Sequence, residues 1–189
     1  MNKLIILASG SGSNAIKIIE YFENQDDTTV SAVLTDNRHA GVLDKCKALN
    51  IPTLYFSAAL FRSSAFIDLL NSFGPDLIIL AGFLKKIPSE VIAEYPDKII
   101  NIHPSLLPKY GGKGMYGAHV HNAVKENNEP ESGISIHYVN EHYDQGQIIA
   151  QFKVALDSQD NAEQIAKKVQ QLEHLHFAPT IATLLKNNE

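Results

Sequence analysis

Short runs of apolar residues alternate along the first half of the chain with longer segments in which apolar residues recur every three or four positions. The short runs predict buried strands at 3–8, 29–34, 53–56, 76–81 and 98–102. The longer segments predict helices at 13–22, 40–50, 58–73 and 88–94. Ser13 or Asn14 is the expected cap of the first helix, and Gly74-Pro75 ends the third. This alternation predicts a parallel sheet with helices on both faces.

The second half of the chain has a different pattern. Residues 104–117 are rich in proline and glycine and predict a loop, and residues 118–126 predict a helix. Two strand-like segments, 133–139 and 147–154, are joined by a short connection, which predicts an antiparallel pair. A long helical region follows at 160–185, with a break expected near Pro179. The chain shows no repeat, low-complexity tract or linker, so a single α/β domain is the simplest interpretation.

Composition and charge narrow the class of protein. Of the 189 residues, 44% are hydrophobic and 20% are charged, values that suit a globular protein with a sizeable core. The net charge of -5 argues against a nucleic-acid-binding protein. No apolar run approaches the ~18 residues of a membrane span, and Ser9-Gly10-Ser11-Gly12 interrupts the apolar start where a signal peptide would continue. We therefore expect a cytoplasmic protein with neither a membrane nor a nucleic-acid partner, and its single cysteine, Cys46, as a buried thiol.

The first strand ends in the glycine-rich loop Ser-Gly-Ser-Gly-Ser-Asn at 9–14. Small residues let a backbone approach an anion closely, and the free N–H groups of the following helix attract negative charge. The loop is not a dinucleotide fingerprint, because Ala15 stands where its third glycine would be, and no Walker lysine follows. The pattern favours phosphate binding over an ordinary strand-to-helix turn, because its serines and Asn14 add donors that a turn does not need.

The fifth strand runs into Asn101-Ile102-His103-Pro104, which places a second candidate site at its carboxyl end. Residues two apart on a strand face the same side, so Asn101 and His103 point together. An amide donor beside an imidazole can stabilise an oxyanion and move a proton, although a histidine packed against a loop is the alternative. A carboxylate at Asp144 would raise the pKa of His103 and favour the cation, but by spacing alone Asp144 is a turn residue.

The other histidines predict no metal site. His119 and His121 are two apart on a predicted helix and diverge, and His174 and His176 share that spacing. His137 alternates with Ser135 on a predicted strand and could face the same cavity as His103, either supporting the site or as an ordinary core or surface residue.

Five segments occur in a characteristic order: Ser-Gly-Ser-Gly-Ser-Asn at 9–14, Leu-Ala-Gly-Phe-Leu at 80–84, Asn-Ile-His-Pro-Ser-Leu-Leu-Pro-Lys-Tyr at 101–110, Asp-Gln-Gly-Gln-Ile-Ile at 144–149 and Gln-Gln-Leu-Glu-His at 170–174. Together they resemble the glycinamide ribonucleotide transformylase family of folate-dependent formyltransferases. The resemblance extends over almost the whole chain. The segment at 101–110 is specific for the wider folate formyltransferase group, and the loop at 9–14 for the glycinamide ribonucleotide branch.

The resemblance implies a Rossmann-like formyltransferase fold in one domain, residues 1–189, with a parallel, phosphate-binding half at 1–103 and a half with the folate loop and C-terminal helix at 104–189. The implied catalytic residues are Asn101, His103 and Asp144. The implied contacts to substrate phosphate and ribose are Gly12, Ser13, Asn14 and Glu173. The implied folate contacts are Arg62, Leu84, Lys85, Lys86, Ile87, Asn101, Val139, Asn140 and Asp144.

The resemblance also implies a reaction. The amine of 5-phosphoribosylglycinamide attacks the formyl carbon of the co-substrate 10-formyltetrahydrofolate directly, without a metal. Asn101 and protonated His103 then stabilise the tetrahedral intermediate, and Asp144 keeps His103 cationic. The sequence leaves open whether the protein is a monomer or a homodimer.

The chain departs from the family pattern in two places. The family often has Asp-Gly-Gly-Pro where residues 144–147 read Asp-Gln-Gly-Gln, which changes the expected shape of the folate loop. The glycine-rich stretch at 111–117 is longer than in some members and is expected to form a mobile flap.

Three alternatives remain open. Methionyl-tRNA formyltransferase normally carries an additional C-terminal domain, and formyltetrahydrofolate deformylase an N-terminal regulatory domain; neither is expected in this sequence. A non-catalytic module that binds a phosphate ligand is the third alternative, and the trio of Asn101, His103 and Asp144 argues against it.

Overall fold

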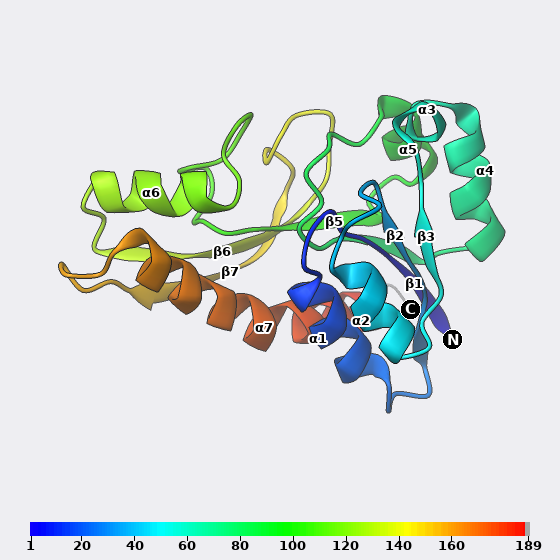
Figure 1. Ribbon diagram of the computed structural model, residues 1–189, viewed down its shortest axis with the longest axis horizontal. Helices are drawn as coiled ribbons and strands as arrows, with labels where there is room; N and C mark the ends of the chain where they lie inside the picture. The colour runs from blue at the N-terminus through cyan, green and yellow to red at the C-terminus, as the bar shows by residue number, and fades with distance from the viewer. Residues whose placement is uncertain (188–189) are drawn as a thin grey trace. The chain divides into compact units, whose positions relative to one another are not determined.

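A computed structural model describes residues 1–187 (Figure 1), and the chain forms two compact units, Met1–Ile100 and the part from Asn101 onward. The first unit contains β1 (Asn2–Leu7), α1 (Ser13–Phe22), β2 (Thr28–Thr35), α2 (Val42–Ala48), β3 (Thr53–Tyr55), α3 (Ala58–Phe61), α4 (Ser64–Phe73), β4 (Leu77–Leu80) and α5 (Ser89–Glu94). Strand β5 (Ile99–His103) crosses into the second unit, which contains α6 (Ala118–Glu126), β6 (Glu131–Tyr138), β7 (Ile148–Ala155) and α7 (Ala162–Asn187).

The first unit is built on parallel strands. Strand β1 pairs with β2 on one side and β4 on the other, and β3 pairs with β2, all in parallel. The segment that enters β5 lies beside β4, because the Ile78 N–H donates to the Lys98 carbonyl at 2.7 Å. The hydrogen-bonded order is β3-β2-β1-β4-β5-β6-β7. The mostly parallel α/β sheet predicted from the alternating pattern is therefore confirmed.

Apolar burial explains why β1 lies at the centre of its unit. Its residues Leu4 to Leu7 are at most 1% exposed, as expected for a strand covered on both faces. Beside the sheet, the rings of Phe56, Phe61, Phe66 and Phe83 form one aromatic cluster with centroid distances of 4.9–6.1 Å. Phe56 comes directly after β3 and Phe83 shortly after β4, so the cluster anchors the chain just beyond the carboxyl ends of these two strands.

The second unit is built on an antiparallel pair. Strands β6 and β7 are antiparallel, as the short connection between them predicts, and their register shifts between Ile136 and His137. Helix α7 packs against both strands and against α6. Its buried residues Ile165, Val169, Phe177 and Ile181 supply much of this unit's core.

Three local predictions are wrong. The helix predicted at 58–73 is two helices, because Ser57 caps α3 through the Leu60 N–H at 3.2 Å and Ser63 stands at the start of α4. The break predicted near Pro179 is absent, and α7 continues through it with buried residues on either side. Packing there outweighs the roughly 3 kcal/mol that an internal proline costs.

The first helix also begins differently from the prediction. Neither Ser13 nor Asn14 caps α1: Gly12 occupies the capping position, in a left-handed conformation with φ of 73° and no side-chain cap. A glycine adopts this conformation without steric cost. A Cβ on Gly12 would also lie 2.3 Å from the Val42 side chain, so α2 begins directly against the loop.

Cys46 is buried, as predicted, and burial raises the pKa of its thiol to about 11. Among the helices of residues 1–187, none is long and apolar enough to cross a membrane.

Candidate active site

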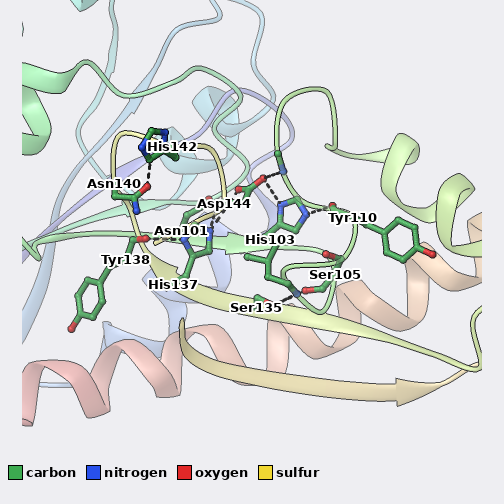
Figure 2. A network of polar contacts seen from close by, with 12 residues as sticks. Asn101, His103, Ser105, Tyr110, Ser135, His137, Tyr138, Asn140, His142 and Asp144 are labelled. Carbon is green, nitrogen blue, oxygen red and sulfur yellow. Dashed lines mark hydrogen bonds and ion pairs between the residues drawn. The ribbon is translucent and has the colours of Figure 1, made fainter. Parts of the chain in front are cut away.

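Four polar side chains of the second unit meet where β5 ends (Figure 2). Strand β5 carries Asn101 and His103 at its carboxyl end, β6 carries His137, and the connection from β6 to β7 carries Asp144. His103 and His137 are 4% and 2% exposed. Neighbouring strands thus supply three of the side chains, and a loop that returns over them supplies the carboxylate.

The contacts are centred on Asp144. One carboxylate oxygen, Oδ2, lies 3.5 Å from His103 Nδ1, and the other, Oδ1, lies 3.7 Å from His137 Nε2. The Asn101 amide nitrogen lies 3.2 Å from the same His137 nitrogen. The structure therefore brings together Asn101, His103 and Asp144, the trio expected from the sequence, and adds His137 as a fourth member.

Backbone groups of the loop after β5 complete the arrangement. His103 Nε2 donates to the Tyr110 carbonyl at 2.7 Å, since a carbonyl can only accept. The Gly112 N–H donates to Asp144 Oδ2 at 2.8 Å. Tyr110 and Asp144 both have positive φ, 55° and 56°. The acceptor at Tyr110 and the donor at Gly112 are both main-chain groups, so no side-chain motif in the sequence predicts them.

Burial decides the charge of His103. Burial lowers the pKa of His103, and this outweighs the Asp144 carboxylate and the Tyr110 carbonyl, which raise it. Asp144 therefore raises the pKa of His103, as expected from the sequence, but burial reverses the net direction of the shift. Burial raises the pKa of the Asp144 carboxyl, but neighbouring groups, His103 and the Gly112 N–H among them, outweigh burial, so that the net shift lowers this pKa. At neutral pH the pair is a neutral imidazole facing a carboxylate.

A buried hydroxyl fixes the loop that follows His103. Ser135 is fully buried on β6; its Oγ donates to the Ser105 carbonyl at 2.7 Å and accepts from the Leu107 N–H at 2.9 Å. Gln151 of β7 donates to the same Oγ at 2.8 Å. Ser135 and His137 therefore face the same side, as their alternation predicts, and both contact the segment that begins at Asn101.

In the first unit, the glycine loop is anchored by Ser9. Its hydroxyl donates to Asp36 Oδ1 at 2.7 Å and accepts from the Leu84 N–H at 3.1 Å. Asp36 also pairs with the Lys85 ammonium at 3.4 Å, and Asn37 donates to the Ser9 carbonyl at 3.2 Å. The loops after β1, β2 and β4 are thus tied together at the carboxyl ends of their strands. The Asp-Asn pair at the end of β2 is a signal that sequence reasoning missed.

The remaining predicted contacts lie in both units. In the first, Leu84, Lys85 and Lys86 are exposed and Ile87 is buried. Arg62 ends α3, where its Nε donates to the Ala58 carbonyl at 3.1 Å. The other residues are partly exposed: Ser13 lies at the start of α1, Val139 and Asn140 follow β6, and Glu173 lies on α7. Asn14 is buried.

The two histidines of α6 differ in burial. His119 is exposed and packs edge-on against the Tyr116 ring, whereas His121 is 7% exposed. The His121 Nδ1 has no hydrogen-bond partner among the described residues. No group of three or more histidine, cysteine, aspartate or glutamate residues within 1–187 could hold a metal ion.

A mostly parallel α/β sheet that carries an amide, two imidazoles and a carboxylate at one strand end is typical of an enzyme that moves protons and stabilises an oxyanion. The sequence matches the formyl transferase family over residues 2–181, and the chain belongs to that family.

Within the family, the chain is similar to proteins named phosphoribosylglycinamide formyltransferase. It is 38% identical to the chloroplastic protein of Arabidopsis thaliana, covering 96% of this chain and 65% of that one. It is 34% identical to the protein of Bacillus subtilis strain 168, covering 100% of this chain and 97% of that one. The chain spans less than two thirds of the Arabidopsis relative and 60% of the Vigna unguiculata relative.

Solved structures of proteins with the same name superpose on this chain. The phosphoribosylglycinamide formyltransferase of Anaplasma phagocytophilum superposes with a TM-score of 0.90 at 27% identity, over 98% of this chain and 87% of that one. The corresponding structure from Bacillus halodurans gives 0.89 at 31% identity, over 100% and 97%. These likenesses confirm the expected fold class.

Proposed function

We propose that this chain transfers the formyl group of 10-formyltetrahydrofolate to the amine of 5-phosphoribosylglycinamide, giving formylglycinamide ribonucleotide and tetrahydrofolate in purine biosynthesis. The observation that carries the proposal is the cluster at the end of β5, in which the His103 imidazole lies 3.5 Å from the Asp144 carboxylate and His137 lies next to both Asn101 and Asp144. The names of the relatives at 34–38% identity support formyl transfer to 5-phosphoribosylglycinamide.

The geometry supports a specific order of proton movements. The substrate amine forms a bond to the formyl carbon, and the carbonyl oxygen becomes an oxyanion that accepts a hydrogen bond from the Asn101 amide. Neutral His103 takes the proton that the amine loses; Nδ1 is the nitrogen available, because Nε2–H is bonded to Tyr110. Asp144 stabilises the resulting imidazolium. The imidazolium returns its proton to the folate nitrogen as the bond from that nitrogen to the formyl carbon breaks.

The glycine loop is the proposed site for the substrate phosphate. Gly12 turns the chain into α1 in a left-handed conformation, and no side chain caps the helix. The first N–H groups of α1 are therefore donors that an anion can accept. Within this proposal, Ser13 and Asn14 add side-chain donors, Glu173 contacts the ribose, and the segments at 84–87 and 139–144 hold the folate.

The proposal also concerns the need for a metal ion, the oligomeric state and the location of the protein. It has no step that needs a metal ion. A monomer and a homodimer are both compatible with it. Its cytoplasmic location is the expectation from the sequence, while the plant relatives are named as chloroplastic proteins.

The decisive experiment supplies three acceptors with 10-formyltetrahydrofolate: 5-phosphoribosylglycinamide, methionyl-tRNA and water alone. The proposal expects tetrahydrofolate release that depends on 5-phosphoribosylglycinamide. Formate release without an acceptor would instead identify a deformylase, and dependence on methionyl-tRNA a tRNA formyltransferase. Tight binding of 5-phosphoribosylglycinamide without turnover would identify a binding module.

A matched pair of variants tests the phosphate site. Ser13→Asp puts a negative charge at the start of α1, whereas Ser72→Asp puts one on the exposed face of α4. Loss of charge-assisted donors costs about 1.5–3 kcal/mol, so we expect Ser13→Asp to raise the KM for 5-phosphoribosylglycinamide by about 10- to 100-fold. The same KM in both variants would remove the loop from the site.

A further inference from the structure

His137 is fully enclosed by the candidate active site, yet the reaction proposed above gives it no step. It is 2% exposed, and both of its ring nitrogens lie near polar atoms. Those neighbours determine which nitrogen carries the proton, and therefore what His137 can do to the side chain next to it.

The Tyr138 carbonyl determines the protonation of the first nitrogen, His137 Nδ1. It lies 2.8 Å from His137 Nδ1, and because a carbonyl only accepts, Nδ1 must carry a hydrogen. The chain at Gly146 keeps this carbonyl in place: a Cβ there would lie 1.7 Å from the Tyr138 oxygen and 3.5 Å from His137 Nδ1. Only a glycine allows the returning chain to pass so close to that carbonyl.

The second nitrogen then has two candidate neighbours. His137 Nε2 lies 3.2 Å from the Asn101 amide nitrogen and 3.7 Å from Asp144 Oδ1. In a neutral ring with hydrogen on Nδ1, Nε2 carries a lone pair, which must face a donor. The Asn101 NH₂ group is such a donor at hydrogen-bonding distance, whereas 3.7 Å is beyond a hydrogen bond to the carboxylate.

We propose that His137 is a positioning residue that fixes the orientation of the Asn101 amide: held by the Tyr138 carbonyl in its Nδ1–H tautomer, it accepts one N–H of Asn101 at Nε2. An amide that could rotate would present its oxygen and its nitrogen alternately. With one N–H committed to His137, the NH₂ side is fixed and its second N–H is the donor that a developing oxyanion requires. This role rests on the proposed function, since it prepares Asn101 for the formyl-transfer intermediate.

The tautomer can be measured directly in wild-type protein of 20.8 kDa. We expect ¹⁵N NMR near neutral pH to show His137 with a protonated Nδ1 and an unprotonated Nε2. A scalar coupling across the hydrogen bond should join Asn101 Nδ2 to His137 Nε2. Two protonated nitrogens, or hydrogen on Nε2 alone, would overturn the proposal and assign His137 to a contact with Asp144 instead.

Two variants separate the acceptor from the shape of the ring. His137→Phe keeps an aromatic ring and removes the acceptor, whereas His137→Gln loses the ring but can place its amide oxygen near the Nε2 position. We expect His137→Phe to lower kcat about 10- to 100-fold with little change in KM, because the lost alignment acts on the transition state. His137→Gln should recover most of that loss. Equal losses in the two variants would refute the acceptor role, and a more active His137→Phe would show that the ring matters only as a space filler.

The NMR readout also distinguishes this proposal from the proposed function. If the wild-type protein forms no formylglycinamide ribonucleotide but shows the expected tautomer and coupling, the reaction is wrong and the orientation of Asn101 stands. If transfer occurs without them, the reaction stands and the role of His137 is refuted.

Discussion

Replacing Asp144 with asparagine removes a charge from the candidate site while preserving the size of the side chain. The carboxylate lies 3.5 Å from His103 Nδ1. At that distance, a carboxylate and an imidazolium attract by about 1 kcal/mol in bulk water and about 5 kcal/mol at an effective dielectric constant of about 20. Because the pair is buried, the expected effect lies well above the lower value, and each 1.4 kcal/mol corresponds to about a tenfold change in rate. We therefore expect kcat at neutral pH to fall about 10²-fold or more.

The pH dependence of activity should change in a definite direction in Asp144→Asn. Burial already lowers the pKa of His103, and Asp144 partly opposes that effect. Without the carboxylate, the pKa of His103 falls further, so the neutral base persists to lower pH. The acid limb of kcat/KM, which reports the free enzyme, should therefore move to lower pH in Asp144→Asn, while the plateau at higher pH drops. KM should change far less, because the lost interaction stabilises an imidazolium that forms only during transfer.

The assay is steady-state formyl transfer from pH 5 to 9, together with NMR titration of His103 in both proteins. Asp160→Asn is the matched control, because it removes another mostly buried carboxylate, one whose pKa is lowered by a hydrogen bond from Lys168. We expect that control to keep wild-type kcat. An unshifted His103 titration, or a nearly active Asp144→Asn, would return Asp144 to a simple turn residue.

Three further variants test the packing around the site. Gly146→Ala should unfold the β6–β7 connection, because its Cβ would lie 1.7 Å from the Tyr138 oxygen; an unchanged melting temperature would contradict this. Ser135→Ala should lower the free energy of unfolding by about 1–3 kcal/mol by leaving the buried Leu107 N–H unpaired, measured by urea denaturation; a loss below 0.5 kcal/mol, roughly that of a surface change, would refute it. His121→Phe should raise that free energy by about 1 kcal/mol at neutral pH, because it removes a buried nitrogen with no partner in the described chain. Burial lowers the pKa of His121, so the gain should grow below about pH 6.5, where protonation favours the unfolded state; a constant gain would refute the cause.

The pattern of hydrophobic residues predicted most helices and strands correctly, because the fold buries the residues that this pattern marks as buried. The continuous apolar runs of β1 and β4 are covered on both faces, so strand type and parallel pairing followed from the sequence. The errors arose where one short contact competes with a regular pattern. The helix predicted at 58–73 divides because a serine caps α3, and the predicted break near Pro179 is absent because packing on both sides of the proline outweighs its cost.

The sequence predicted those parts of the candidate site that are side chains on strands. The spacing of Asn101 and His103 correctly indicated that they lie together, and the alternation of Ser135 with His137 correctly indicated that they share one side of β6. The contacts of the Tyr110 carbonyl and the Gly112 N–H could not be predicted, because they depend on how a glycine-rich loop folds back.

The net direction of the His103 pKa shift is the one property of the trio that the sequence did not predict, and the reason is physical. A carboxylate in the same site suggests a cation if distance alone is considered. The structure adds enclosure: at 4% exposure, the loss of water disfavours the imidazolium more than a carboxylate 3.5 Å away favours it. A neutral base that becomes a stabilised cation only after it takes a proton suits a reaction in which an amine must lose one. The same enclosure that makes the resting cation unfavourable strengthens its attraction to Asp144 during transfer, so the burial that sequence could not reveal determines how this couple would act.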